Sequence, residues 1–136
     1  MRVIVFGCGR FGAKVAEVLD RRGHSVTVIS SDPEAFGRLP PTFRGKVAVG
    51  KGIDVDVLRN SGVEGADAFI ALSDGDNTNV VASQIAKHIL HVPIVISQIK
   101  DPIREDTYQT LGIQTICPTR LGADRIREVI AADQKP

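Results

Sequence analysis

Three glycines at the spacing G-x-G-x-x-G lie close to the start of the chain, directly after a short apolar run. Residues Val3 to Phe6 are β-branched or aromatic and end at a glycine, which is typical of a buried strand. Residues 10–22 repeat apolar side chains along one face, which predicts a helix. The three glycines, Gly7, Gly9 and Gly12, therefore lie at a strand-to-helix turn.

Each glycine of this turn has a predicted physical role. Gly7 permits the tight turn, Gly9 lets the backbone approach a pyrophosphate, and Gly12 lets the helix lie against the strand. The start of the helix offers unpaired backbone N–H groups and the positive end of the helix dipole to an anion. Because the motif follows a strand and opens a helix, we interpret it as a nucleotide-phosphate site. The alternative is a glycine turn with a purely structural role.

Length and charge limit the classes of protein to which the chain can belong. Its 136 residues indicate one domain, residues 1–136, too small for a nucleotide-binding domain plus a separate catalytic domain. The formal net charge of +1 and the dispersed charges give no electrostatic footprint for nucleic acid or an anionic membrane. No apolar run approaches the roughly 20 residues of a membrane span, and no signal peptide precedes the first strand. We therefore expect a cytoplasmic protein without direct membrane insertion.

The cysteines and the paired histidines do not predict a metal site. Cys8 and Cys117 lack metal or disulfide spacing, and each lies beside a predicted strand end, so both are interpreted as buried free thiols. His88 and His91 are one helical turn apart, but no carboxylate or cysteine joins them. We interpret them as surface residues and expect no metal.

Strand-like and helix-like segments alternate along the rest of the chain. Further strands are predicted at residues 25–30, 46–49, 66–72, 93–98 and 114–117, and further helices at residues 33–39, 53–60, 78–91, 103–111 and 119–132. This alternation is typical of a parallel sheet covered on both faces. With right-handed crossovers it predicts an α/β, Rossmann-like, doubly wound parallel six-stranded sheet of order 3-2-1-4-5-6.

The end of the second predicted strand is where an acidic side chain would take the ribose hydroxyls of a dinucleotide. This chain has Ser30 there. Asp32 is the nearest acid, but Asp32-Pro33-Glu34 has the pattern of a helix N-cap, so Asp32 is interpreted chiefly as a cap. Ser30 and Ser31 would then face the ribose. A serine pair also admits a 2′-phosphate, as in NADP, although no arginine adjoins it in the sequence.

Three other places near strand ends offer candidate ligand contacts. Lys51, between two glycines that include Gly52, is placed to reach a base, ribose or phosphate edge, or is a solvated turn lysine. Ser73 and Asp74 follow the fourth strand, at the sheet edge where ligands of open α/β sheets collect. Lys100 lies just past the fifth strand and could close over a phosphate. Within the loop after Asp74, Asp76 or Asn77 could equally be the cap of the next helix, residues 78–91.

Several motifs together resemble one known family, the N-terminal nucleotide-binding domain of RCK proteins (regulators of potassium conductance), also called the TrkA-N or KTN domain. The motifs are Gly7-Cys8-Gly9-Arg10-Phe11-Gly12, Gly23-His24, Gly50-Lys51-Gly52, Asp56-Val57-Leu58-Arg59, Asp67 to Leu72, Asp76-Asn77-Thr78-Asn79, Leu111-Gly112 and Cys117-Pro118. The resemblance spans nearly the whole chain. We expect a single domain of this kind, without the second ligand-binding lobe common in this family.

The resemblance implies a regulatory, non-catalytic domain that binds NAD(H), ATP, ADP or related adenine nucleotides such as AMP. It implies a gating subunit of a potassium transporter or channel, cytoplasmic and peripheral on the inner face of the membrane, which forms a homodimer or higher oligomer. The contacts it implies are phosphate at Gly7, Gly9, Arg10 and Phe11, ribose at Ser30, adenine side at Lys51 and Gly52, and further contacts at Ser73, Asp74 and Lys100.

Two other functional classes are alternatives to a regulator of potassium flux. One alternative is an NAD(P)-dependent oxidoreductase, but Tyr108 is followed four residues later by Gly112, so a Y-x-x-x-K dyad is absent. Another is a nucleotide-sensing module on a different transporter.

The apolar side of helix 119–132, which includes Gly122 and Ile126, is a candidate dimer contact, and its alternative role is ordinary packing on the chain's own sheet.

Overall fold

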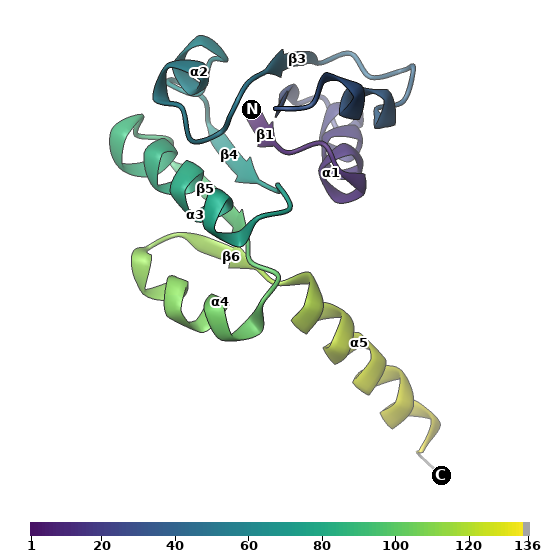
Figure 1. Cartoon of the computed structure of the whole chain (residues 1–136). Coiled ribbons are helices and arrows are strands. Elements are labelled where there is room, and N and C mark those ends of the chain that lie inside the picture. Colours follow the sequence, from purple (N-terminus) through teal and green to yellow (C-terminus); the bar gives the residue numbers. More distant parts are fainter. Residues whose placement is uncertain (135–136) are drawn as a thin grey trace.

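The computed structural model describes residues 1–134 and contains one six-stranded sheet in which every strand pair is parallel (Figure 1). The strands are β1 (Arg2–Phe6), β2 (Ser25–Ser30), β3 (Lys46–Val49), β4 (Ala68–Ala71), β5 (Ile94–Gln98) and β6 (Gln114–Ile116). Their order is β3-β2-β1-β4-β5-β6, so the predicted doubly wound order is confirmed. The glycine turn follows the strand that lies between the two halves of the sheet.

Helices connect the strands. The α-helices are α1 (Arg10–Arg21), α2 (Val55–Asn60), α3 (Asp76–Gln84), α4 (Pro102–Tyr108) and α5 (Pro118–Asp133). The 3₁₀ helices are η1 (Pro33–Arg38) and η3 (Gln109–Leu111), and η2 (Ile85–Ile89) is a π-helical continuation of α3. The helix predicted at residues 78–91 therefore begins two residues earlier and changes its winding after Gln84.

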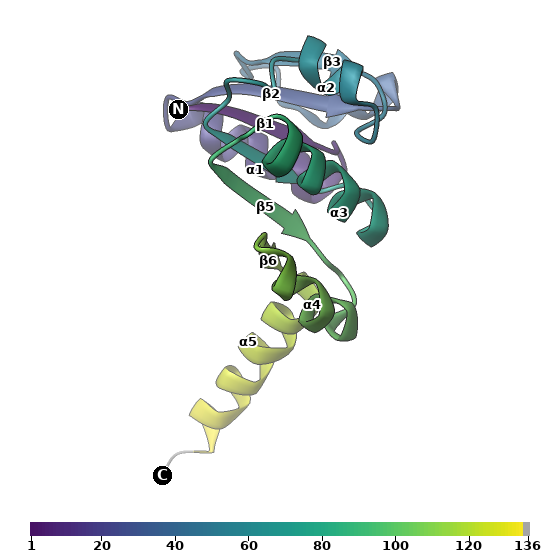
Figure 2. The ribbon, with the colours of Figure 1, turned by 90° about the vertical axis from the view of Figure 1, so that its left-hand side faces the viewer.

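Hydrophobic side chains are buried on both faces of the sheet because successive β1 residues point to opposite sides. On one face the sheet residues Ile4, Phe6, Ile29 and Phe69 pack with Leu58 of α2 and Ala82 of α3. On the other face Val3, Val5, Val26 and Val28 pack with Ala13 of α1 and Ala35 of η1. Figure 2 shows the sheet between these helices. The core thus holds the carboxyl ends of β1, β2 and β4 in fixed positions.

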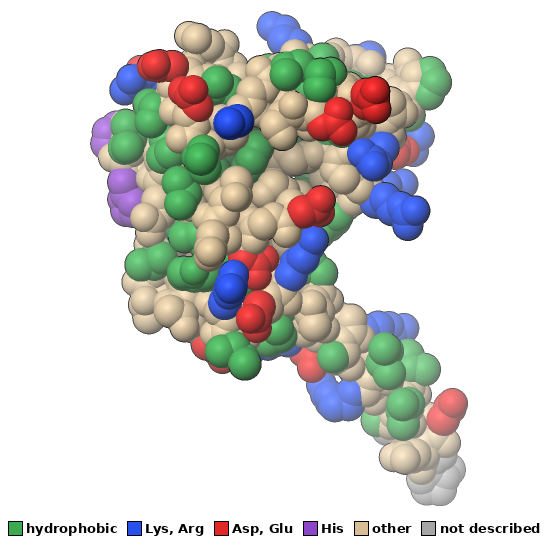
Figure 3. All heavy atoms as spheres, in the orientation of Figure 1, with side chains coloured by type: hydrophobic (Ala, Val, Ile, Leu, Met, Phe, Trp, Pro, Cys, Tyr) green, Lys and Arg blue, Asp and Glu red, His purple; other side chains and the backbone are tan. Residues whose placement is uncertain are grey.

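Helix α5 departs from this layered arrangement and projects away from the sheet (Figures 1 and 2). None of its described residues is buried, and Leu121, Ile126 and Ile130 are 56%, 64% and 55% exposed. Figure 3 shows hydrophobic side chains on the surface of the projecting helix. The alternative that this helix packs on its own sheet is therefore wrong for the described residues.

Of the helices within residues 1–134, none combines the length and the apolar composition required to cross a bilayer.

Candidate functional site

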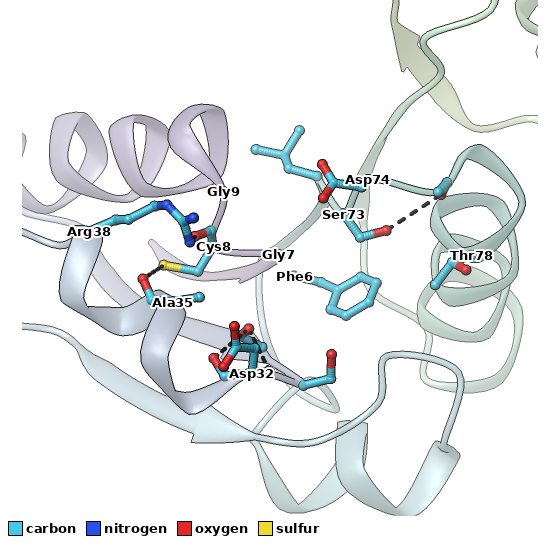
Figure 4. A pocket seen from close by; sticks show the side chains of 14 residues that line it. Phe6, Gly7, Cys8, Gly9, Asp32, Ala35, Arg38, Ser73, Asp74 and Thr78 are labelled. Atoms are coloured by element: carbon cyan, nitrogen blue, oxygen red, sulfur yellow. Dashed lines mark hydrogen bonds between the residues drawn. The ribbon is translucent and has the colours of Figure 1, made fainter.

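A cleft of about 410 Å³ opens at the carboxyl ends of β1, β2 and β4 (Figure 4). It is lined by Phe6, Gly7, Cys8, Gly9, Ser30, Ser31, Asp32, Ala35, Arg38, Leu72, Ser73, Asp74, Gly75 and Thr78. In an open α/β sheet, this edge beside the strand-order reversal is where ligands bind. The structure therefore brings together three predicted segments, the glycine turn, the end of β2 and the loop after β4.

Two glycines of the turn are required by the chain itself. Gly7 has a φ of +106°, and a Cβ there would lie 2.6 Å from the backbone of Leu72. A Cβ at Gly12 would lie 2.1 Å from the carbonyl oxygen of Gly7, so only glycine lets α1 approach the turn this closely. Gly7 and Gly12 thus act as the predicted turn and packing glycines.

Gly9 differs from the other two glycines. Its backbone is extended, with φ −75° and ψ −169°, a conformation that any residue adopts. A Cβ built at Gly9 would meet no atom of the described chain within 4 Å. Gly9 is the N-cap of α1, and no side chain of residues 1–134 caps the first N–H groups of that helix by a hydrogen bond. A glycine here leaves open space directly in front of free backbone donors.

The side chains of Ser30 and Asp32, at and just after the end of β2, already form hydrogen bonds within the chain. The Ser30 hydroxyl, in a residue 7% exposed, accepts from the Asp32 amide and donates to the Asp32 carbonyl, both at 3.1 Å. The Asp32 carboxylate accepts from the Glu34 amide at 3.0 Å and caps η1, with Pro33 at its first turn. The interpretation of Asp32 as a helix cap is confirmed. Ser31 lines the same wall of the cleft.

The loop after β4 is held by a buried asparagine to which the sequence analysis gave no site role. Asn79 is fully buried; its Oδ1 accepts from the Ser73 amide at 2.9 Å, and its Nδ2 donates to the carbonyls of Ser73 and Gln98, each at 3.0 Å. One side chain therefore ties the carboxyl ends of β4 and β5 together. The family motif that ends at Asn79 was the signal that could have identified it.

Asp76 does not have the predicted capping role. Helix α3 begins at Asp76 itself, and its N-cap is Gly75, which provides no side-chain hydrogen bond. The Asp76 carboxylate instead accepts from the backbone amides of Lys100 and Asp101 at 2.8 and 3.2 Å. The prediction that Asp76 or Asn77 caps this helix is wrong, because the Asp76 side chain binds the loop after β5.

Several other predicted contact residues lie outside the cleft lining. Lys100 does not line the cleft, but its ammonium lies 3.3 Å from the carboxylate of Asp74, which does. Such an exposed pair is worth little by itself, so both side chains remain available to a ligand. Lys51 is exposed, and Gly52 lies behind Phe6, because a Cβ at Gly52 would lie 2.3 Å from the Phe6 ring.

The side chain of Arg10 faces a second depression, which we call the side groove. It has a volume of about 330 Å³ and is lined by Arg10, Ala13, Lys14, Glu17 and Arg38. Of the other predicted phosphate contacts in this helix, Phe11 is partly exposed and Gly12 is buried.

Arg38 is a residue of the cleft that was not predicted from the sequence. It ends η1, and its Nη1 donates to the Cys8 carbonyl at 3.3 Å. Arg38 lines both the cleft and the side groove. No arginine adjoins the serine pair along the sequence, but η1 brings Arg38 into the cleft wall that contains Ser30 and Ser31. The feature of the sequence that could have identified Arg38 was a cationic residue a short distance after the second predicted strand.

Cys8 is a buried thiol in the wall of the cleft. It is 3% exposed, and its Sγ donates to the Ala35 carbonyl at 3.3 Å. Burial raises the pKa of the Cys8 thiol above its ordinary value, and the positive charge of Arg38 partly opposes this effect. The thiol is therefore protonated at neutral pH. Cys8 and Cys117 are both free and buried, as predicted. Within the described residues, no group of three potential metal-ligating side chains comes together.

The chain is similar to proteins of known families. The family model described as the TrkA-N domain matches residues 3–118. The Trk system potassium uptake protein TrkA of Streptomyces coelicolor is 41% identical over 137 residues, covering 100% of this chain and 61% of that protein. A TrkA homolog of Pyrococcus abyssi is 34% identical over 109 residues, covering 80% and 48%. The chain thus spans about half to six tenths of the length of these relatives.

Solved structures share the fold at lower identity. The Kef C-terminal domain of Shewanella denitrificans in its AMP-bound form has a TM-score of 0.81 and 20% identity, with 99% of this chain and 83% of that chain covered. The GsuK channel bound to NAD has a TM-score of 0.71 and 22% identity, with 86% and 21% covered.

Proposed function

Because the chain belongs to the TrkA-N domain family, we propose that it is the nucleotide-binding part of a regulator of potassium uptake. Its ligand in the cleft would be NAD(H) or an adenine nucleotide such as ATP, ADP or AMP. Two comparisons support this proposal. The Streptomyces and Pyrococcus relatives are named as potassium uptake proteins, and the structurally similar Kef and GsuK proteins are described as bound to AMP and NAD.

The observation that carries the proposal is the open space at Gly9. Neither the backbone conformation nor the packing of the described chain requires glycine there, whereas both require it at Gly7. A ligand that must approach the backbone closely provides the missing reason. The uncapped start of α1 lies at the same point and would donate its amides, including those of Arg10 and Phe11, to phosphate oxygens.

The rest of the cleft extends to both sides of this phosphate position. Toward β2, the ribose would lie against Ser31 and Asp32, since the hydroxyl of Ser30 is engaged with backbone. Toward β4, the remainder of the ligand would contact Ser73 and Asp74. The Asp74–Lys100 pair can open at little cost, which would let Lys100 reach a phosphate.

A regulatory role requires that nucleotide binding change something beyond the cleft. We propose that the domain forms a homodimer or higher oligomer through the apolar side of α5, which includes Ile126, Val129 and Ile130. The nucleotide would favour one arrangement of paired domains by the difference between its affinities for the two arrangements. The partner would be a membrane potassium transporter or channel subunit, with this domain on the cytoplasmic face.

We propose a regulatory rather than a catalytic role. Among the described residues that line the cleft there is no histidine, lysine or tyrosine, the side chains that most often transfer protons beside a nicotinamide or carbonyl group. The names of the curated relatives also describe potassium uptake and not an oxidoreductase.

A nucleotide panel tests the proposal directly. Thermal shifts with NAD, NADH, NADP, ATP, ADP and AMP should show stabilisation by at least one of them, about 2.7 kcal/mol at 100 times its dissociation constant. Gly9→Val should abolish the shift, because the new side chain fills the space in front of the α1 amides. Gly37→Val is the matched control: a Cβ at Gly37 also meets nothing within 4 Å of the described chain, and Gly37 does not line the cleft. Unchanged binding by Gly9→Val would contradict the phosphate position.

A further inference from the structure

Arg38 provides the cleft with an arginine whose charge no carboxylate of the described chain neutralises. In residues 1–134 no acidic oxygen lies within 4.0 Å of its guanidinium, and its hydrogen bond is a long one, to the Cys8 carbonyl at 3.3 Å. Figure 4 shows the side chain extending from η1 along the wall of the cleft toward Cys8. A guanidinium carries five donors in a fork that suits phosphate oxygens. Most of these donors remain available to a ligand.

The end of β2 lacks the feature that would select an unmodified ribose. An acidic side chain there accepts hydrogen bonds from the ribose hydroxyls and repels a 2′-phosphate. This chain has Ser30, which is buried and carries no charge. Asp32 lines the same wall, but its carboxylate is turned to the Glu34 amide at the start of η1. An added phosphate would therefore meet the uncharged Ser31 and the cationic Arg38, and the attraction of Arg38 would have to exceed the repulsion from the exposed Asp32 carboxylate in the same wall.

The side groove continues this cationic surface. Arg38 borders the cleft and the side groove alike, and Arg10 and Lys14 line the groove from α1. The one acid there, Glu17, is already paired with Arg21 at 2.9 Å and with Lys14 at 3.7 Å. The positive charges of Arg10 and Arg38 are thus not cancelled, and the groove of about 330 Å³ has room for a phosphate group.

From these observations we propose that Arg38 and the side groove form a subsite for the 2′-phosphate of an adenosine ribose, so that the cleft prefers NADP(H) to NAD(H). This inference rests on the proposed function, because it assigns the ribose end of the same cleft. Ser31 would donate a hydroxyl hydrogen bond to the phosphate, and Arg38 would fork onto its oxygens. Arg10 and Lys14 would contribute charge from the far side of the groove.

Calorimetric titration of the whole chain with paired ligands tests the subsite. NADP differs from NAD, and adenosine 2′,5′-bisphosphate from AMP, only by the 2′-phosphate. The wild-type chain should bind the phosphorylated member of each pair at least about tenfold more tightly, the usual size of one charge-assisted hydrogen bond. Arg38→Gln should remove this preference by weakening the phosphorylated ligands, while the dissociation constants of NAD and AMP change by less than about threefold.

Arg44→Gln is the matched control, because Arg44 is an exposed arginine that lines a different depression, beside His24 and Lys46. It should leave every dissociation constant unchanged. Equal affinity for NAD and NADP in the wild-type chain would overturn the inference. So would an equal loss of affinity for NAD and NADP in Arg38→Gln, which would place the arginine on the pyrophosphate.

The same titrations separate the two proposals. If AMP or NAD binds and Gly9→Val abolishes that binding, but no ligand pair shows a preference, only the 2′-phosphate subsite is wrong. If neither these ligands nor ATP, ADP or NADH from the thermal-shift panel bind the wild-type chain, the proposed function is wrong and the subsite fails with it.

Discussion

Asn79 and Ser73 exchange hydrogen bonds in both directions: the Asn79 Oδ1 accepts from the Ser73 amide at 2.9 Å, and the Asn79 Nδ2 donates to the Ser73 carbonyl at 3.0 Å. The same Nδ2 also donates to the Gln98 carbonyl. Gln98 contributes a second contact, because its Nε2 donates to the Ser73 carbonyl at 3.2 Å. Asn79 is fully buried and makes most of the side-chain hydrogen bonds that hold this wall of the cleft.

Asn79→Ala should destabilise the fold by about 2–4 kcal/mol, because it removes a fully buried side chain and with it the side-chain partner of the Ser73 amide and of the Gln98 carbonyl. The measurement is denaturant unfolding, with the m-value checked for two-state behaviour. Asn60→Ala, an exposed asparagine at the end of α2, serves as the control and should change stability by about 0.5 kcal/mol or less. An Asn79→Ala variant as stable as this control would show that the loop does not depend on the amide.

Gly7 and Gly9 should respond differently to the same substitution. Gly7→Ala is expected to cost at least about 2 kcal/mol, because it combines a positive φ with a 2.6 Å approach to the Leu72 backbone. Gly9→Ala is expected to cost about 1 kcal/mol or less, the usual effect of alanine at an N-cap. Unfolding without ligand measures both, and a comparable cost at the two positions would mean that Gly9 has a structural role.

Ser30→Asp should restore the acidic group that accepts ribose hydroxyls. We expect NAD to bind about tenfold more tightly and NADP to bind more weakly, because the new carboxylate would repel a 2′-phosphate. Paired titrations with the two dinucleotides measure the change. If neither affinity changes, the ribose is held by Asp32 instead.

The Cys8 thiol should make stability depend on pH in the alkaline range. Its folded-state pKa is raised, so its contribution is fully present below the unfolded pKa of about 8.5 and is lost as the pH rises through the folded pKa. The free energy of unfolding of the wild-type chain should therefore fall above about pH 8.5 more steeply than that of Cys8→Ala. Denaturant unfolding at a series of pH values makes the comparison, and parallel curves would show that the thiol ionises equally in both states.

The exposed side of α5 predicts association. Ile126 and Ile130 are 64% and 55% exposed, so replacing both with glutamate should leave the monomer's stability nearly unchanged while it prevents assembly. Light scattering after size exclusion should give a mass above the monomer for the wild type and the monomer mass for the double variant. Arg127→Gln on the same helix is the control and should assemble like the wild type. A wild-type chain that stays monomeric at its highest soluble concentration would exclude this interface.

The central sheet was predictable from the sequence because each of its strands is marked by residues that are adjacent in the chain. Each strand is a short apolar run, and the glycine turn after β1 places strand and helix on either side. Right-handed crossovers then leave few choices for strand order. Asp32 was also predictable as a cap, since its partner, the Glu34 amide, is only two residues away.

The features that were missed depend on contacts between distant segments. Asp76 has the local pattern of a cap, but it binds the amides of Lys100 and Asp101, 24 and 25 residues away. Arg38 reaches the glycine turn, 30 residues before it, only because η1 packs against the sheet. For α5, a helical period identifies an apolar side but does not say whether the sheet or another surface covers it.

The projection of α5 has a mechanical consequence. Its 16 residues form a rod about 24 Å long, so a tilt of about 10° at Pro118 displaces the far end by about 4 Å. Arg120, in the first turn of the rod, donates to the Pro102 carbonyl and pairs with Glu105 in α4. Helix α4 follows β5, whose end is tied through Asn79 to the wall of the cleft. A small rotation of α4 would therefore produce a larger displacement at the C-terminal end of α5.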